Sequence, residues 1–304
     1  MLSFILILLA AVIFPGCIAL TKAKFSGRKG ASILQPLFDI QRLLRKGSVY
    51  STTSSLIIQI APTFYLCGIV VAATFVPFGE YKGIFSFSGD FVVFAYLFAL
   101  GKFMMIIGAM DLGSSFEGMG ANREAFYSML VEPSFFILMG SLALLTDKSS
   151  FYEFYNHIHF GSSLSYVIAV LGIYLLVHIA LVENSRLPVD DPTTHLELTM
   201  IHEVMVLDHS GFDLGLIGIA NALKFAIYGA LISNFILPDN LPFWANILFF
   251  FAVQIGFAIS VGWIESFRAR NKIEKNPQFI MTLVVISVLV FFTTLILTHK
   301  LVLN

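Results

Sequence analysis

The sequence predicts an all-α polytopic membrane protein that crosses the bilayer about eight times. Of its 304 residues, 58% are hydrophobic and 12% are charged, whereas soluble chains have roughly 45–50% apolar and about 25% charged residues. Eight apolar stretches are each long enough for the ~20 residues that a helix needs to cross ~30 Å of hydrocarbon. Because lipid cannot hydrogen-bond the backbone, and because the stretches are too long for barrel strands, we expect helices. This composition excludes a cytosolic enzyme, a nucleic-acid binder and a secreted disulfide-rich domain.

The expected spans follow one another as a single membrane domain over residues 1–304. They cover residues 3–21, 58–78, 91–110, 125–146, 164–182, 214–237, 243–264 and 279–299. The longer polar connections are expected at residues 22–57, 111–124, 183–213 and 265–278. Strict alternation of the spans places these four connections on the same side of the membrane.

The basic residues predict which side that is. Thirteen of the 18 Lys and Arg residues lie in those four connections, three lie on the opposite side, and Lys102 and Lys224 lie within spans. Because Lys and Arg are enriched in cytoplasmic loops, the four connections are expected in the cytoplasm. Both termini are then outside a multi-pass protein of the cytoplasmic (inner) membrane.

The first connection is expected to contain an amphipathic helix. Its apolar and basic residues recur at helical spacing on opposite faces: Leu34, Leu37, Phe38 and Leu44 against Arg42, Arg45 and Lys46. A helix of this kind lies in the headgroup plane and binds anionic membrane lipid.

The connection 183–213 is unusually acidic and is interrupted by apolar residues. It holds seven of the 19 acidic residues, and Arg186 is its only Lys or Arg. The alternation of acidic and apolar residues indicates packing against other loops or against a docked protein. His195, His202 and His209 are spaced by seven residues, which on a helix separates neighbours by about 10 Å, too far for one metal ion. We interpret them as titratable groups that pass protons or respond to pH.

Ionisable residues within or next to spans mark ion pathways or structural pairs, because charge is costly in the bilayer. The candidates for a proton path are Glu132, Lys224, Lys102, Glu183, Glu197, Glu203, His178 and Glu124. Structural pairing, for example of Lys102 with an acid, is the alternative for each residue alone. No nucleophile and base stand in a recognisable motif, so no catalytic residue is expected in this chain. Only two cysteines occur, Cys17 and Cys67, which cannot ligate an iron–sulfur cluster, so any redox centre lies in another protein.

Several motifs carry a resemblance to a known family. They are Gly27–Gly30 with Leu34–Pro36, Asn122–Glu124 with Glu132–Pro133, Glu183–Asp190, and Asp208–Gly211. In this order they resemble complex I subunit 1, the membrane subunit that caps the quinone chamber. The resemblance spans essentially the whole chain and implies the eight-helix fold of that family.

The connection after Pro188 favours one branch of this family. It departs from the usual complex I pattern through Val189, Asp190, Asp191 and Pro192. This departure is similar to the corresponding subunit of group 4 energy-converting [NiFe] hydrogenases and formate hydrogenlyase complexes. The resemblance implies a non-catalytic subunit that couples electron transfer to movement of protons or sodium ions. It implies hydrogenase large and small subunits, iron–sulfur subunits and antiporter-like membrane subunits as partners, with the [NiFe] centre and iron–sulfur clusters held by them and no cofactor in this chain.

The resemblance also implies roles for individual residues. Glu132 matches the acid at the start of the family's central proton axis, and Glu197 matches an acid of the fifth connection. The residues that match loop motifs, or lie beside them at the interface with soluble subunits, are Arg28, Lys29, Arg123, Arg186, Asp190, Asp191 and Asp208. Two alternatives stay open, a true quinone-chamber subunit with bound quinone and a free-standing ion or solute transporter.

Overall fold

The computed structural model describes residues 1–52, 54–157, 163–191, 200–237 and 242–298. Eight of its helices are long and apolar enough to span a membrane. The all-α polytopic fold that the sequence predicts is therefore confirmed for the described residues. The elements are α1 (Leu2–Phe25), α2 (Gln35–Leu44), α3 (Leu56–Ala73), α4 (Asp90–Asp111), α5 (Ser115–Thr146), α6 (Phe151–His157), α7 (Ser163–Glu183), α8 (His202–Met205), α9 (Gly211–Ile236), α10 (Phe243–Phe267), a 3-10 turn (Ile273–Lys275) and α11 (Asn276–Leu297).

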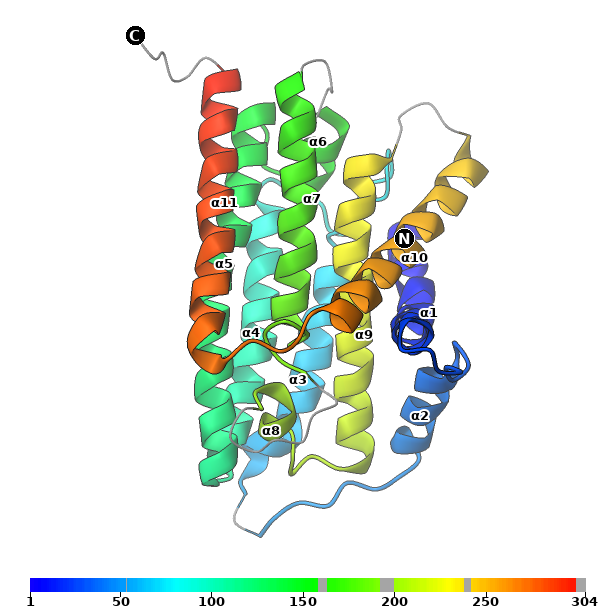
Figure 1. Ribbon diagram of the computed structural model, residues 1–304, viewed down its shortest axis with the longest axis vertical. Coiled ribbons are helices and arrows are strands. Elements are labelled where there is room, and N and C mark those ends of the chain that lie inside the picture. The colour runs from blue at the N-terminus through cyan, green and yellow to red at the C-terminus, as the bar shows by residue number, and fades with distance from the viewer. Residues whose placement is uncertain (53, 158–162, 192–199, 238–241, 299–304) are drawn as a thin grey trace.

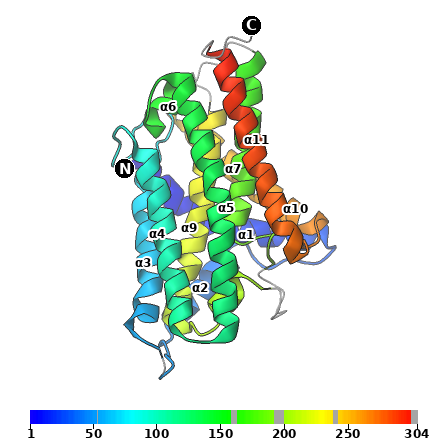
Figure 2. The same cartoon turned by 90° about the vertical axis from the view of Figure 1, so that its left-hand side faces the viewer.

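The long helices form a bundle around α9. Helices α3, α4, α5, α7 and α11 run roughly along the long axis, and α1 and α10 pack on each other and on α9 at a steep tilt (Figures 1 and 2). Among the spans α9 is the most completely buried. Any charged residue on its inner positions is therefore shielded from both water and lipid.

The two ends of the bundle differ. Helices α2 and α8 lie toward the end where α3, α5 and α9 begin, and α6 lies at the opposite end (Figure 1). We call these the α8 end and the α6 end. The side of the membrane that each end faces stays a prediction from the basic residues.

Most of the connection expected at residues 111–124 is helical, because α5 begins at Ser115. Gly118 and Gly120 therefore lie within a helix. Gly120 allows α8 to approach the helix, since a Cβ added at this position would lie 2.8 Å from the carbonyl oxygen of Ile201. Only a short turn, with Gly113 at φ +67°, separates α4 from α5.

Two smaller differences lie at the α6 end. Helix α3 ends at Ala73 instead of residue 78, and Phe78 pairs with Tyr81 in a short bridge. Helix α6 was not expected, because seven residues are too few to show a helical pattern.

The amphipathic helix expected in the first connection is present as α2. It packs on α9 where that helix carries glycine, since a Cβ added at Gly215 would lie 2.9 Å from Cδ2 of Leu44. Its location in the headgroup plane stays a prediction.

Candidate functional site

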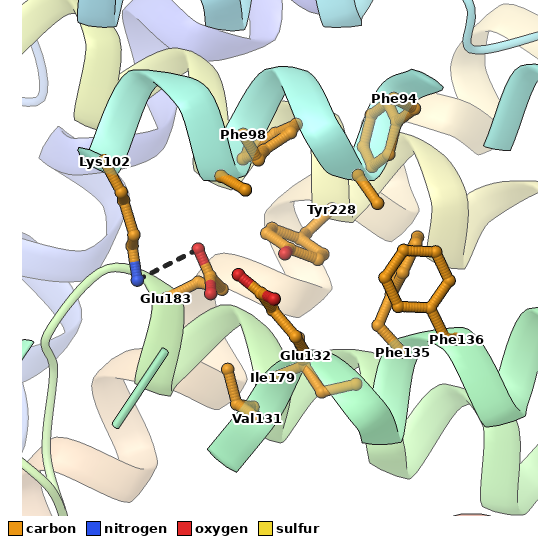
Figure 3. Close-up of a pocket in the computed structure, with 12 residues that line it drawn as sticks. Phe94, Phe98, Lys102, Val131, Glu132, Phe135, Phe136, Ile179, Glu183 and Tyr228 are labelled. Atoms are coloured by element: carbon orange, nitrogen blue, oxygen red, sulfur yellow. Dashed lines mark ion pairs between the residues drawn. The ribbon is translucent and has the colours of Figure 1, made fainter. Parts of the chain in front are cut away.

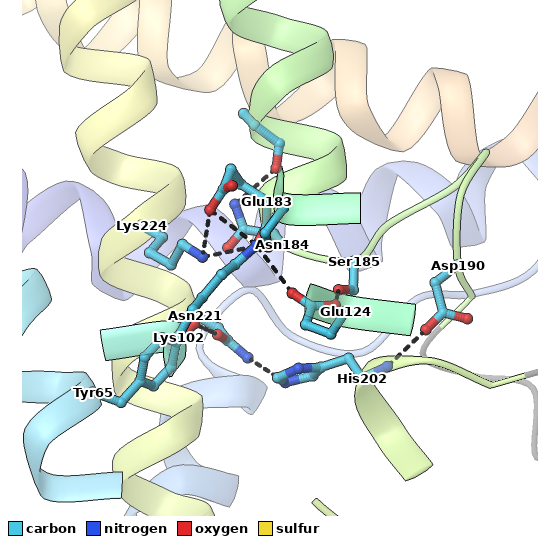
Figure 4. Close-up of polar contacts among 12 residues, drawn as sticks. Tyr65, Lys102, Glu124, Glu183, Asn184, Ser185, Asp190, His202, Asn221 and Lys224 are labelled. Carbon is cyan, nitrogen blue, oxygen red and sulfur yellow. Dashed lines mark hydrogen bonds and ion pairs between the residues drawn. The ribbon is translucent and has the colours of Figure 1, made fainter. Parts of the chain in front are cut away.

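Four charged side chains meet in the interior of the bundle. They are Lys102 of α4, Glu124 of α5, Glu183 at the end of α7 and Lys224 of α9 (Figure 4). We call them the central cluster. None is more than 8% exposed, and Lys224 is fully buried. Four different helices therefore each contribute one charge to the same buried site.

Short contacts link these four residues into one chain of alternating charge. Lys102 Nζ lies 3.0 Å from Glu124 Oε1 and 3.2 Å from Glu183 Oε2, and it donates to Ser128 Oγ at 2.8 Å. Lys224 Nζ lies 3.2 Å from the same Glu183 Oε2. Two lysines and two carboxylates balance formally, which is how proteins make buried charge tolerable.

The end of α7 shapes this site. Lys224 Nζ donates at 2.7 Å to the carbonyl oxygen of Glu183, one of the carbonyls that a helix leaves without a partner in its last turn. The chain then turns through Ser185 at φ +48°. This turn brings Ser185 Oγ to Glu124 Oε2, to which it donates at 3.0 Å. The helix end thus fixes both carboxylates of the central cluster.

A line of neutral side chains borders the central cluster toward the α8 end. Tyr65 OH of α3 donates to Asn221 Oδ1 of α9 at 2.7 Å, and Asn221 Nδ2 lies 3.3 Å from His202 Nε2 (Figure 4). Burial lowers the pKa of His202 to about 4; nearby Glu124 opposes this shift, and Lys224 and Lys102 add to it.

Asp190 anchors the segment that carries His202. Its Oδ2 accepts hydrogen bonds from the backbone N–H groups of Ile201 and His202, both at 3.1 Å, and Arg270 Nη2 donates to its Oδ1 at 2.6 Å. Burial raises the pKa of Asp190, while Arg270 and the backbone donors lower it. The carboxylate thus ties the connection before α8 to the connection before α11.

A second set of ion pairs lies nearer to α1 and α10. Glu265 is 5% exposed and stands 3.6 Å from Lys22 Nζ and 3.4 Å from Arg186 Nη1. Lys22 Nζ also lies 3.9 Å from Asp191. Among the described residues, neither oxygen of Glu265 accepts a hydrogen bond. Together with Asp190 and Arg270 we call these residues the peripheral ion pairs.

Glu132 lies beside the central cluster, on the outer surface of α5. It lines a small cavity of about 30 Å³ together with Lys102, Glu183 and Tyr228 (Figure 3). Its side chain also lines an open groove of about 560 Å³ between α4 and α5. The carboxyl group thus stands between the buried cluster and the outside of the bundle.

The other residues predicted from the sequence lie apart from the central cluster. His178 packs between Tyr174 and Phe279, with ring centroids 4.1 and 5.9 Å away, and its Nδ1 contacts the Tyr174 carbonyl oxygen at 2.9 Å. The two ring contacts indicate that His178 packs against aromatic side chains. Glu203 is half-buried on α8, whereas Glu197 and His195 lie outside the described residues.

The predicted interface residues occupy the connections at or near the α8 end. Arg123 donates to the Met200 carbonyl oxygen at 3.1 Å, which fastens α5 to the segment before α8. Arg28 and Lys29 are exposed in the turn between α1 and α2, and Asp208 is exposed before α9. Exposure leaves these three side chains accessible at the surface of the described chain.

Sequence reasoning missed several polar members of the site: Tyr65, Ser128, Ser185, Asn221 and Glu265. Tyr65 and Asn221 stand within apolar runs, and that isolation was the available signal. Among the described residues, no three His, Cys, Asp or Glu side chains gather as a metal site would require.

Residues 1–296 match the NADH dehydrogenase family. The chain belongs to this family. Its members include complex I subunit 1, as the sequence motifs indicated. This NADH dehydrogenase family protein is accordingly a membrane subunit of a complex I-related respiratory complex.

Two curated relatives come from Escherichia coli (strain K12). Hydrogenase-4 component C is 28% identical over 236 residues, which cover 77% of this chain and 73% of the relative. Formate hydrogenlyase subunit 4 is 25% identical over 214 residues, which cover 70% and 69% respectively. Both are distant homologues of this family member.

A solved structure confirms the family fold. A chain of the membrane-bound sulfane sulfur reductase, an archaeal respiratory membrane complex, superimposes with a TM-score of 0.82 at 19% identity. The superposition covers 96% of this chain and 97% of that chain. The eight-span, complex I subunit 1-like fold is therefore shared.

Proposed function

We propose that this protein is the coupling subunit of a [NiFe] hydrogenase or formate hydrogenlyase complex. It links electron transfer in a soluble arm to the movement of protons or sodium ions. The observation that carries the proposal is the buried Glu–Lys–Glu–Lys chain, 3.0–3.2 Å between charged atoms, next to Glu132 on the outer surface of α5. Burial penalises the charged forms of lysine and glutamate, whereas a nearby opposite charge stabilises them, so a change in this balance can move a proton within the cluster.

The proposal assigns the two ends of the bundle different roles. The α8 end, with the basic first connection and the segment anchored by Asp190, faces the cytoplasm and docks the hydrogenase and iron–sulfur subunits. Those subunits hold the [NiFe] centre and the clusters. The similarity to hydrogenase-4 component C and formate hydrogenlyase subunit 4 supports this branch of the family.

The ion path is proposed to leave the cluster sideways. Phe94, Phe98 and Phe135 line the cavity, and buried Phe151 packs on Phe94 with ring centroids 5.3 Å apart. Glu132 instead opens into the groove between α4 and α5. A cavity of about 30 Å³ can hold roughly one or two waters that bridge Glu132 to Glu183. An antiporter-like membrane subunit in the groove would then receive the proton.

The experiment uses the native complex with Glu132→Gln in this subunit, and Glu80→Gln, exposed near the α6 end, as the matched control. We expect Glu132→Gln to assemble and to lose ion movement or slow electron transfer about 10²-fold or more, as removal of a proton-transfer group does. Unchanged turnover and unchanged ion movement would contradict the coupling role. Absence of nickel and iron–sulfur partners from the purified complex would contradict the hydrogenase branch.

A quinone-chamber role is a second candidate that one feature favours. An apolar groove of about 450 Å³ lies between α1, α2 and α9, with Leu8, Leu37 and Leu223 among its lining residues. Its size falls in the range of small-molecule sites, and its lining suits a long apolar tail. Inhibition of the complex by quinone analogues would favour this candidate over the first.

A further inference from the structure

The hydrogen bonds around Asn221 have a fixed direction. Tyr65, 3% exposed, donates its hydroxyl to Asn221 Oδ1 at 2.7 Å. The amide oxygen is therefore turned toward Tyr65, and the amide nitrogen is turned toward His202 Nε2 at 3.3 Å. An amide nitrogen only donates hydrogen bonds. With the amide in this orientation, His202 Nε2 accepts the hydrogen bond and carries no proton.

The charges around the imidazole agree with a neutral ring. The titratable groups that face His202 from the packed elements are Tyr65 of α3, Lys102 of α4, Glu124 of α5, Glu183 of α7, Lys224 of α9 and His209 of the turn before α9. Two lysines stand among them, and burial lowers the pKa of His202 to about 4. Near neutral pH the ring is therefore uncharged.

His202 also borders a very small cavity. With Lys102, Glu124, Glu183 and Asn221 it lines a cavity of only about 10 Å³, at or below the volume that one water requires. Among the residues that line this cavity, His202 carries the ring that a proton moving toward the α8 end would meet. Protonating the ring requires Nε2 to give up the hydrogen bond from Asn221.

We propose that Tyr65, Asn221 and His202 form a neutral seal, in which Asn221 positions His202 as a fixed acceptor that stops protons passing between the central cluster and the α8 end. The inference rests on the proposed coupling function and specifies how coupling occurs. A change of charge or conformation at the α8 end affects the central cluster electrostatically and through the segment that Asp190 anchors. Protons are exchanged on the Glu132 side. Under this proposal His202 responds to charge without carrying protons, which narrows the interpretation made from the sequence.

Asn221→Asp in the native complex tests the seal with a near-isosteric change. The carboxylate introduced at position 221 accepts a hydrogen bond from Tyr65. Because a carboxylate cannot donate, its hydrogen bond to His202 requires a proton on Nε2, and the adjacent negative charge favours the imidazolium. We expect a new titration step between about pH 5 and 8 in the profile of turnover. We also expect fewer ions moved per electron. Asn156→Asp on α6 is the matched control and should show neither change.

Rescue by conservative variants separates a seal from a relay. In Asn221→Asp with His202→Gln the titrating ring is absent, so the new step should disappear. His202→Gln alone keeps an acceptor and should keep the ratio of ions to electrons, whereas His202→Leu removes the acceptor and should lower it. Loss of ion movement in His202→Gln would identify a proton carrier and overturn the seal, as would an unchanged profile in Asn221→Asp.

Two further measurements keep the result interpretable. If Asn221→Asp does not assemble, Tyr65→Phe removes the hydroxyl that holds the Asn221 amide in its orientation, and the ratio of ions to electrons should again fall. An unchanged ratio would overturn the seal. Glu132→Gln is measured in parallel. A coupling defect in Glu132→Gln without any effect at Asn221 rejects the seal alone, whereas no defect in Glu132→Gln rejects the proposed function.

Discussion

The central cluster and the peripheral ion pairs are both buried arrangements of charge, yet they are built differently. In the central cluster, lysines meet carboxylates at 3.0–3.2 Å, and both lysines also donate shorter hydrogen bonds to uncharged oxygens. In the peripheral ion pairs, Glu265 stands 3.4–3.6 Å from its cations without accepting a hydrogen bond, whereas Arg270 donates to Asp190 at 2.6 Å. The central charges come from helix interiors or ends that converge, and the peripheral charges come from helix ends and connections.

The two sets also differ in the chemistry of their cations. A buried lysine can exchange its proton when its surroundings change, whereas arginine stays charged. The central cluster contains Lys102 and Lys224, while the peripheral set relies on Arg186 and Arg270 with the half-buried Lys22. We therefore propose that the central cluster exchanges protons and that the peripheral ion pairs hold the connections in place. Four variants test this division.

The largest effect is expected for Lys102→Met. It leaves Glu124 and Glu183 sharing a buried site with one fewer positive charge, and breaking such a pair costs about 3–5 kcal/mol. Assembly of the complex, followed by native gel electrophoresis, should fall sharply, and the remaining complex should lose coupled turnover. Lys148→Met, exposed near the α6 end, should stay within about 0.5 kcal/mol of the wild type. Normal assembly and coupling of Lys102→Met would remove the basis for treating the central cluster as one unit.

Arg270→Gln should have the next largest effect, roughly 1–3 kcal/mol, because Asp190 keeps its backbone donors. Without Arg270 the pKa of Asp190 rises further above its ordinary value. The ionised carboxylate then costs stability above that pKa, and protonation removes the cost as the pH falls. The loss of thermal stability should therefore be larger at about pH 8 than at about pH 5.

Two controls sharpen the Arg270 prediction. Adding Asp190→Asn to Arg270→Gln removes the charge and should remove the pH dependence. Arg268→Gln changes an exposed arginine of the same connection and should leave thermal stability unchanged. A loss that is equal at both pH values would show that Arg270 acts through packing and not through the Asp190 carboxylate.

Glu265→Gln should cost less, about 1 kcal/mol, because its cations are partly solvated and no hydrogen bond is lost. Turnover and the ratio of ions to electrons should be retained, in contrast to variants of the central cluster. Glu274→Gln, an exposed acid near the start of α11, is the control. Loss of coupling in Glu265→Gln at normal stability would place the peripheral ion pairs in the ion path.

Lys22→Gln should have the smallest effect, below about 1 kcal/mol, since its side chain is 31% exposed and its pairs are long. The double variant with Glu265→Gln gives the coupling free energy between the two residues. A coupling free energy of about 3–5 kcal/mol, the cost expected for breaking a buried pair, would erase the distinction between the two sets of charges.

Part of the candidate site could be predicted from its residue types alone. Lys102, Lys224, Glu132 and Glu183 stand in or beside apolar runs, where an ionisable residue needs a partner. His178 also stands in an apolar run, yet it packs between aromatic rings. Its Nδ1 finds a polar partner within its own helix, the carbonyl oxygen of Tyr174. Residue type therefore marked which side chains need partners, but not which partners they find.

The all-α membrane fold, the eight apolar spans and the family could be predicted from the chain, because apolar length and motif order are properties of the sequence. The packed structure was needed to see that Glu124 lies in a helix interior, that Asn221 faces both Tyr65 and His202, and that Glu132 stands at the outer surface. These facts depend on how residues up to 156 positions apart meet when helices pack. Hydropathy reports the environment of each segment, whereas the pairing of buried charges depends on which helix faces converge.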